Sequence, residues 1–211
     1  MKNKKEERET YRGSRAKHQA EPNSTALLLV VLLRPRPKQC RSEQMGENLG
    51  QLKVTVVRGK RLVIRDFKSS DPYVVVKLGS QVAKTKVINS CLNPVWNEEL
   101  CFSLSEPVGV LNLEVFDKDY FKTDDRMGHA HFSLHPLVSA ARLRKVLKVS
   151  SGETTLRKVV PDSENCLVGE SSIACVDGEV VQVAWLRLCG VESGEIQLKM
   201  KLIETPVAGT R

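Results

Sequence analysis

The sequence predicts an all-β fold, built as an antiparallel β-sandwich. Apolar and polar residues alternate in several short runs, and turn-forming residues separate these runs. The chain has 211 residues, 41% of them hydrophobic, which is enough for one domain with a core. Short, evenly spaced strands joined by polar loops are typical of antiparallel sandwiches. No apolar run approaches the roughly 20 residues of a membrane-spanning helix, which excludes an integral membrane protein.

The alternating runs follow one another from Gln51 to Leu202. In each run every second residue is apolar and is expected to face the core, while the residues between them face outward. Turns are expected where Gly, Ser, Asn and Pro interrupt the alternation. The apolar sets are Leu52, Val54 and Val56; Val74, Val76 and Leu78; Leu111, Leu113 and Val115; Ala184, Leu186 and Leu188; and Ile196, Leu198, Met200 and Leu202.

One short helix and one long insertion are expected between the strands. The helix is predicted at 136–146, where Leu137, Ala140, Leu143 and Leu147 recur at near-helical spacing. Residues 161–179 are less regular and are expected to form an insertion before the last two strands. Insertions of this length often carry function.

The first 45 residues differ from the rest of the chain. They contain 11 Lys and Arg against 5 Glu, and so carry six of the eight net positive charges. Residues 2–23 lack apolar periodicity, so a disordered basic arm is expected over 1–45. The apolar run Ala26–Leu33 has neither the flanks nor the small-residue cleavage site of a signal peptide. Alternatively, Met45 is the start and residues 1–44 are an upstream extension.

The six cysteines are interpreted as reduced thiols in a cytosolic protein. None of them forms a C-x-x-C pair, so neither a zinc-finger signature nor a clear disulfide framework is present. They are Cys40, Cys91, Cys101, Cys166, Cys175 and Cys189.

The aspartates give the strongest functional signal. Six of the eight lie in two short segments, RDFKSSDPY and FDKDYFKTDDRMG, and each segment follows an alternating strand. Loops at strand ends can share one end of a sandwich, and clustered carboxylates repel one another unless a cation neutralises them. Oxygen ligands with flexible geometry favour Ca²⁺, and the lack of nearby His or Cys pairs argues against zinc. The spacing places Asp117 and Asp119 on one side, and Asp125 returns as the loop closes.

Aromatic and basic residues occupy the same two loops. Phe67, Tyr120 and Phe121 are expected at the loop tips, where exposed rings gain nothing from water. Basic residues surround them, namely Lys68, Lys118, Lys122 and Arg126. Exposed aromatic side chains at loop tips, with basic side chains around them, favour shallow insertion into an anionic bilayer.

Several motifs together resemble a known family. The runs LKVTVVRGKRLVIRDFKSSDPYVVVKLG, KTKVINSCLNPVWNEEL and LNLEVFDKDYFKTDDRMGHA resemble an eight-stranded type-II C2 domain of the plant single-domain kind. The run NCLVGESSIACVDGEVVQVAWLRL resembles the signature segment of the plant C2-domain abscisic-acid-related proteins. The resemblance assigns residues 46–206 to the C2 domain and 207–211 to a tail, and it does not extend to the arm.

The resemblance implies the residues of two sites. The calcium ligands would be the carboxylates of Asp66, Asp71, Asp117, Asp119 and Asp125, with backbone carbonyls from Arg65 and Lys118. Asp124 is expected beside the ions, and His129 and His131 are expected to face solvent. Lipid would contact Phe67, Lys68, Tyr120, Phe121 and Lys122 at the tips, and a second basic patch of Tyr73, Lys77, Lys84 and Lys86. Exposed lysines on a strand are also ordinary edge protection.

The resemblance also implies a function without catalysis. Members bind phospholipid vesicles in the presence of Ca²⁺ and bring abscisic acid receptors to the plasma membrane, and some stimulate GTPases. The expected location is the periphery of the plasma membrane, together with cytoplasm and nucleus.

Two other functions compete with this one. A protein that activates a small or translation-factor-like GTPase directly often uses an inserted arginine, and no spacing marks one among the conceivable residues Arg126, Arg142, Arg144 and Arg157. No nucleophile–base set or phosphate-binding glycine loop is present either. Nucleic-acid binding by the arm would be weak and salt-sensitive, so no specific nucleic acid partner is expected.

Overall fold

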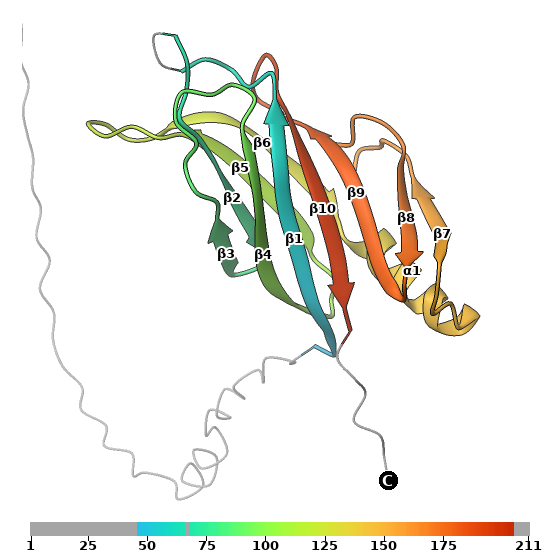
Figure 1. Ribbon diagram of the computed structural model, residues 1–211. Coiled ribbons are helices and arrows are strands. Elements are labelled where there is room, and N and C mark those ends of the chain that lie inside the picture. Colours follow the sequence, from blue (N-terminus) through green and yellow to red (C-terminus); the bar gives the residue numbers. More distant parts are fainter. Residues whose placement is uncertain (1–45, 66–67, 205–211) are drawn as a thin grey trace, which may run out of the picture. The chain divides into compact units, whose positions relative to one another are not determined.

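Two antiparallel sheets lie face to face in the computed structural model, which describes residues 46–65 and 68–204 (Figure 1). Six strands form one sheet in the order β4-β1-β10-β9-β8-β7, and four form the other in the order β3-β2-β5-β6. The elements are β1 (Asn48–Lys60), β2 (Pro72–Leu78), β3 (Gln81–Lys84), β4 (Val95–Ser105), β5 (Val110–Asp117), β6 (Asp125–Ser133), α1 (His135–Leu147), β7 (Glu153–Val159), β8 (Ser171–Val176), β9 (Glu179–Arg187) and β10 (Glu195–Ile203).

The predicted antiparallel sandwich is confirmed, although the number of strands differs. The part of the chain that the structure describes has ten strands rather than eight. The difference lies at one edge of the six-stranded sheet, where β7 pairs with β8 and β8 pairs with β9. Residues 161–179 are therefore not wholly an irregular insertion, because Ser171, Ile173 and Cys175 alternate into the core as a strand. The arm at 1–45 and the tail at 207–211 lie outside the described residues.

The alternating apolar sets form the core between the sheets. Leu52, Val54 and Val56 of β1 are fully buried, as are Leu111, Leu113 and their counterparts on neighbouring strands. Trp96 is 8% exposed, and its indole N–H donates to the carbonyl of Pro72 at 3.3 Å. It therefore fills the core and also ties β4 to the start of β2.

Helix α1 connects β6 to β7, as predicted, and its bounds extend one residue beyond the prediction at each end. Proline in its first turn suits a helix start, because the missing N–H has no helical partner there. Leu137 and Ala140 are buried, whereas Leu143 and Leu147 are exposed, so the predicted apolar face is buried only in its first half. Over the described residues, none of the helical segments combines the length and the apolar character needed to cross a bilayer.

Candidate functional site

The two aspartate loops meet at one end of the four-stranded sheet. In the strand register Pro72 lies opposite Asp117, and Asp117 lies opposite Asp125. Because β2 begins, β5 ends and β6 begins at this point, the residues that flank these strands converge. The predicted convergence of the aspartates is therefore present for Asp71, Asp117 and Asp125. Asp66 and Phe67 lie outside the described residues.

Hydrogen bonds join the two loops directly. The backbone N–H of Asp71 donates to Asp117 Oδ1 at 2.5 Å, and the N–H of Lys118 donates to the carbonyl of Asp71 at 3.0 Å. Asp71 Oδ1 also accepts the N–H of Ser90 at 2.7 Å, which brings in the loop before β4. Asp117 is 1% exposed. A buried carboxylate thus organises the contact between the loops.

A lysine ammonium lies between two of the predicted ligands. Lys122 Nζ is 2.8 Å from Asp125 Oδ2 and 3.5 Å from Asp119 Oδ2. The hydrogen bond that Lys122 donates to Asp125 raises the pKa of Lys122, with a further contribution from Asp119. Within its own loop, this ammonium provides the positive charge that a metal ion would provide.

Asp124 is held by three donors and stands beside the other carboxylates. Its Oδ2 accepts the hydroxyl of Tyr73 at 2.7 Å, and its Oδ1 accepts Lys118 Nζ at 3.0 Å and the Asp119 N–H at 3.1 Å. The hydrogen bond from Tyr73, together with Lys118, holds the pKa of Asp124 below its usual range. Burial, and then the bond to Asp124, raises the pKa of Tyr73 to about 12. The three donors fix the Asp124 carboxylate, and its position beside calcium ions stays a prediction.

The donor chemistry of the loops fits a hard cation, although the side chains are arranged around lysines. Over 46–65 and 68–204, no group of three or more His, Cys, Asp or Glu side chains could hold a metal ion as arranged. Carboxylate oxygens are the ligands that Ca²⁺ prefers, and they come here from two loops that hydrogen bonds already join. Arg65, predicted to offer its carbonyl, donates its N–H to Ser70 Oγ at 2.9 Å and its Nε–H to the carbonyl of Arg126 at 3.0 Å.

The tip of the β5–β6 loop exposes its aromatic side chains. Tyr120 is 75% exposed and Phe121 is 103% exposed, so the rings contribute almost nothing to the core. Lys122 follows them directly, and Lys68 is exposed on the first loop. The sequence prediction that rings stand at this tip therefore holds for Tyr120 and Phe121.

Three residues of the second predicted basic patch lie on the outer face of the four-stranded sheet, whereas Lys86 follows the end of β3 and donates its backbone N–H to Glu98 Oε1 at 2.7 Å. Lys84 pairs with Val75, which places it on the face that also carries Tyr73 and Lys77. Lys77 forms an ion pair with Glu114, and the hydrogen bond from Lys77 lowers the pKa of that carboxyl. Tyr73 stacks on Phe116 at 5.6 Å between ring centroids. Glu114 therefore offsets part of the positive charge of the patch, which the sequence did not indicate.

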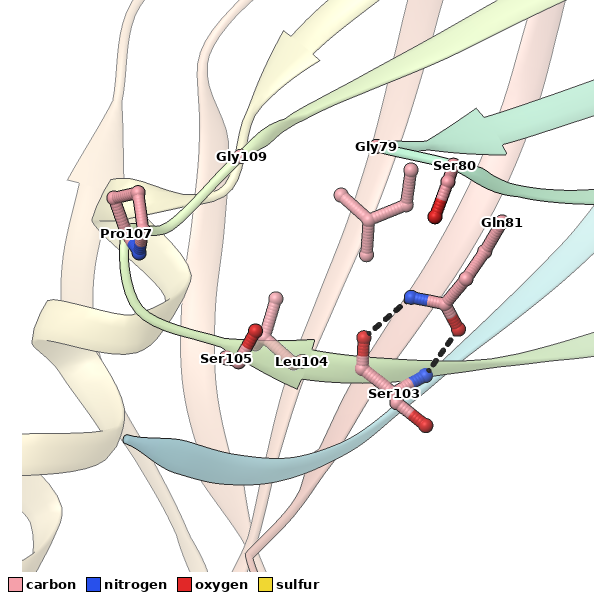
Figure 2. Close-up of a pocket in the computed structure, with 9 residues that line it drawn as sticks. Gly79, Ser80, Gln81, Ser103, Leu104, Ser105, Pro107 and Gly109 are labelled. Carbon is pink, nitrogen blue, oxygen red and sulfur yellow. Dashed lines mark hydrogen bonds between the residues drawn. The ribbon is translucent and has the colours of Figure 1, made fainter. Parts of the chain in front are cut away.

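A small hollow lies at the opposite end of the sandwich from the aspartate loops. Its volume is about 190 Å³, and Figure 2 shows Gln81 reaching across to the backbone of Ser103. Gln81 Nε2 donates to the Ser103 carbonyl and Gln81 Oε1 accepts the Ser103 N–H, both at 2.7 Å. Serines, glycines, leucines and a proline form the rest of its lining. No titratable side chain lines it, so this hollow offers little for chemistry.

Sequence reasoning missed one cluster, at the seam between β6 and β9. His129 is exposed as expected, but His131 is half-buried, with its Nδ1 3.3 Å from Cys166 Sγ. Cys166 Sγ is also 3.7 Å from Cys189 Sγ. The two cysteines are 23 residues apart in the chain, so no local motif could have indicated the pair.

Residues 50–149 match the family model described as "C2 domain". The chain is 73% identical over 162 residues to "Protein C2-DOMAIN ABA-RELATED 11" of Arabidopsis thaliana, covering 77% of this chain and 98% of that protein. It is 44% identical over 162 residues to "GTPase activating protein 1" of Oryza sativa subsp. indica, covering 77% of this chain and 96% of that protein.

A solved, calcium-bound structure of the paired C2 domains of Extended-Synaptotagmin 2 has a TM-score of 0.50 at 22% identity, covering 75% of this chain and 47% of that chain. At this level of identity the likeness concerns the fold alone.

Proposed function

The chain belongs to the plant C2-domain abscisic-acid-related family, and we propose that it is a calcium-dependent adaptor that binds anionic phospholipid membranes through residues 46–206. The observation that carries this proposal is the convergence of the aspartates at the starts of β2 and β6 and the end of β5. A sandwich gains no stability from carboxylates gathered at one end, so their gathering favours a cation-binding role. Among residues 46–65 and 68–204 no nucleophile with an adjacent base accompanies them, which favours binding rather than catalysis.

Calcium would be held by the side chains of Asp66, Asp71, Asp117, Asp119 and Asp125, with carbonyls from Arg65 and Lys118. Lys122 is the internal competitor for this position, because its ammonium contacts both Asp119 and Asp125. If these carboxylates held a divalent ion, the Lys122 ammonium would be freed to contact lipid phosphate, and this end of the domain would gain positive charge.

Membrane attachment would then combine electrostatics with shallow insertion. Each bound ion adds two positive charges to an end whose carboxylates otherwise repel anionic headgroups. Basic side chains near the surface contribute about 1 kcal/mol each. Phe121 and Tyr120, already exposed, enter the bilayer interface together with Phe67 and Lys68. Tyr73, Lys77, Lys84 and Lys86 form a second, weaker contact on the sheet.

The partners at the membrane would be abscisic acid receptors, which the adaptor brings to the plasma membrane from cytoplasm and nucleus. This part rests on the family name of the Arabidopsis relative and on the segment around Asn165–Gly178. A second candidate function, stimulation of a GTPase, is favoured by the name of the rice relative. A GTPase turnover assay with and without the protein separates the two.

The calcium assignment is tested by thermal unfolding of the full chain. At a calcium concentration about 100 times the Kd, binding adds about 2.7 kcal/mol to the free energy of unfolding, which corresponds to about 5–10 °C in Tm. Asp117→Asn with Asp119→Asn should remove this shift, while Asp177→Asn, on the β8–β9 turn, should keep it. No response of the wild-type Tm to Ca²⁺ would exclude the metal site.

A further inference from the structure

A pair of cysteine side chains lies at the seam where the insertion meets β6 and β9. Cys166 and Cys189 have their sulfur atoms 3.7 Å apart, and both are free thiols. Cys166 is 5% exposed, whereas Cys189 is partly open to solvent. A disulfide has its sulfurs about 2.05 Å apart, so rotation of the side chains would have to bring them about 1.7 Å closer.

Backbone hydrogen bonds fix both cysteines against the same strand. The N–H of Cys166 donates to the carbonyl of His131 at 3.0 Å, and the His131 N–H donates to Cys166 Sγ at 3.3 Å. Cys189 and His129 exchange two backbone bonds, at 2.7 and 3.1 Å. Since His129 and His131 are two apart on β6, the cysteines are held side by side by one rigid strand. Their proximity is therefore a property of the sheet.

His131 is placed to take a proton from Cys166. Its Nδ1 is 3.3 Å from Cys166 Sγ, and its Nε2 is 3.4 Å from the carbonyl oxygen of Ser163. When Nε2 carries the proton and faces that carbonyl, Nδ1 presents a lone pair to the thiol. Burial, with a further contribution from Cys189, raises the pKa of Cys166, so a nearby base matters for its reactivity.

We propose that Cys166 and Cys189 form a reversible oxidation site, at which a peroxide converts two thiols into a disulfide. The more exposed Cys189 thiolate attacks hydrogen peroxide, so that one oxygen joins the sulfur as a sulfenic acid and the other leaves as hydroxide. His131 takes the Cys166 proton, and the Cys166 sulfur attacks the sulfenic sulfur. The S–S bond forms, the S–O bond breaks, and hydroxide leaves. Two thiols and one peroxide thus give a disulfide and two waters.

The bond would join the insertion to the turn between β9 and β10. Cys166 lies in the insertion. Its carbonyl accepts the N–H of Arg187, the last residue of β9, at 2.8 Å. Cys189 precedes the turn whose Ser193 hydroxyl donates to the Arg61 carbonyl at 2.9 Å. A covalent link between them closes a loop with a sequence separation of 23 residues and restricts the unfolded chain. Formation of this disulfide requires neither calcium nor a membrane.

The test treats the reduced full chain with hydrogen peroxide and follows free thiols, cross-linked peptides and Tm. We expect one Cys166–Cys189 cross-link per chain, a higher Tm, and reversal of both by dithiothreitol. Cys166→Ser and Cys189→Ser should each abolish the link and the Tm shift. Cys101→Ser, which removes an exposed thiol, should keep both.

Two histidine variants test the role of the base. His131→Gln should slow disulfide formation severalfold, while His129→Gln, on the same strand, should leave the rate unchanged. Equal rates in the two variants would overturn the role assigned to His131. The oxidation site would be refuted if peroxide left Cys166 and Cys189 without a cross-link. It would also be refuted if a bound zinc ion protected both thiols until it was removed by a chelator.

Discussion

Phe121 offers the sharpest test of how the loops attach to a membrane. Its side chain is 103% exposed, so the fold uses none of its apolar surface and all of it is available to lipid. Burying a phenylalanine side chain is worth about 1.5–3 kcal/mol. Phe121→Ala should therefore weaken binding to anionic vesicles in the presence of Ca²⁺ by roughly 10- to 150-fold. Partitioning measured over a range of lipid concentrations gives this ratio directly.

The same exposure predicts what Phe121→Ala leaves unchanged. The free energy of unfolding should change by less than about 0.5 kcal/mol, because an exposed side chain packs against nothing. Val146, 77% exposed on α1 at the far end of β6 from Asp125, is a matched control, and Val146→Ala should not alter vesicle binding. Unchanged vesicle binding by Phe121→Ala, with calcium binding intact, would refute insertion of this tip.

Three further predictions follow from the charged groups and the insertion. Lys122→Met should raise the calcium affinity measured by calorimetric titration, because the variant lacks the ammonium that competes for the carboxylates. The same variant should bind anionic vesicles more weakly. A lower calcium affinity would contradict the competition. Burial alone would raise the pKa of Glu195, but Lys60 and Arg61 hold it below its usual range. The two basic side chains therefore stabilise the folded state above the pKa of an unfolded glutamate, about 4.3. This stabilisation is lost as pH falls through the lower pKa of Glu195 in the folded state. Glu195→Gln should thus cost about 1–2 kcal/mol in urea unfolding at pH 7 and less near pH 3, and an equal cost at both would contradict the assignment. Val168→Asp, at a side chain that is 47% exposed in the segment before β8, should lower affinity for an abscisic acid receptor in a pull-down and leave the Tm unchanged, and full affinity would contradict a role of this segment.

The fold was predictable because apolar and polar residues alternate along a strand that has one face in the core and the other in solvent. Val74, Val76 and Leu78 are buried where the alternation placed them. The strand at Ser171–Val176 was missed because small residues such as Ser171 and Ala174 dilute the apolar signal. Its pairing with β7 and β9 depends on tertiary contacts that the local pattern does not record.

The candidate site was predictable only as far as strand ends determine it. Asp71, Asp117 and Asp125 converge because antiparallel strands bring their ends together. The position of Lys122 between Asp119 and Asp125 depends on the shape of the loop, which sequence spacing does not specify. The Cys166–Cys189 contact depends on two segments meeting the same strand, so it could be seen only in three dimensions.

Sedimentation with vesicles, with and without Ca²⁺, tests the central claim most directly. The full chain is mixed with anionic or purely zwitterionic vesicles over a series of salt concentrations, and the bound fraction is measured. Binding should require both Ca²⁺ and anionic lipid and should weaken as salt rises, because screening reduces the attraction between the loops and the headgroups. Equal binding to zwitterionic vesicles, or binding that neither calcium nor salt changes, would contradict a calcium-gated electrostatic switch.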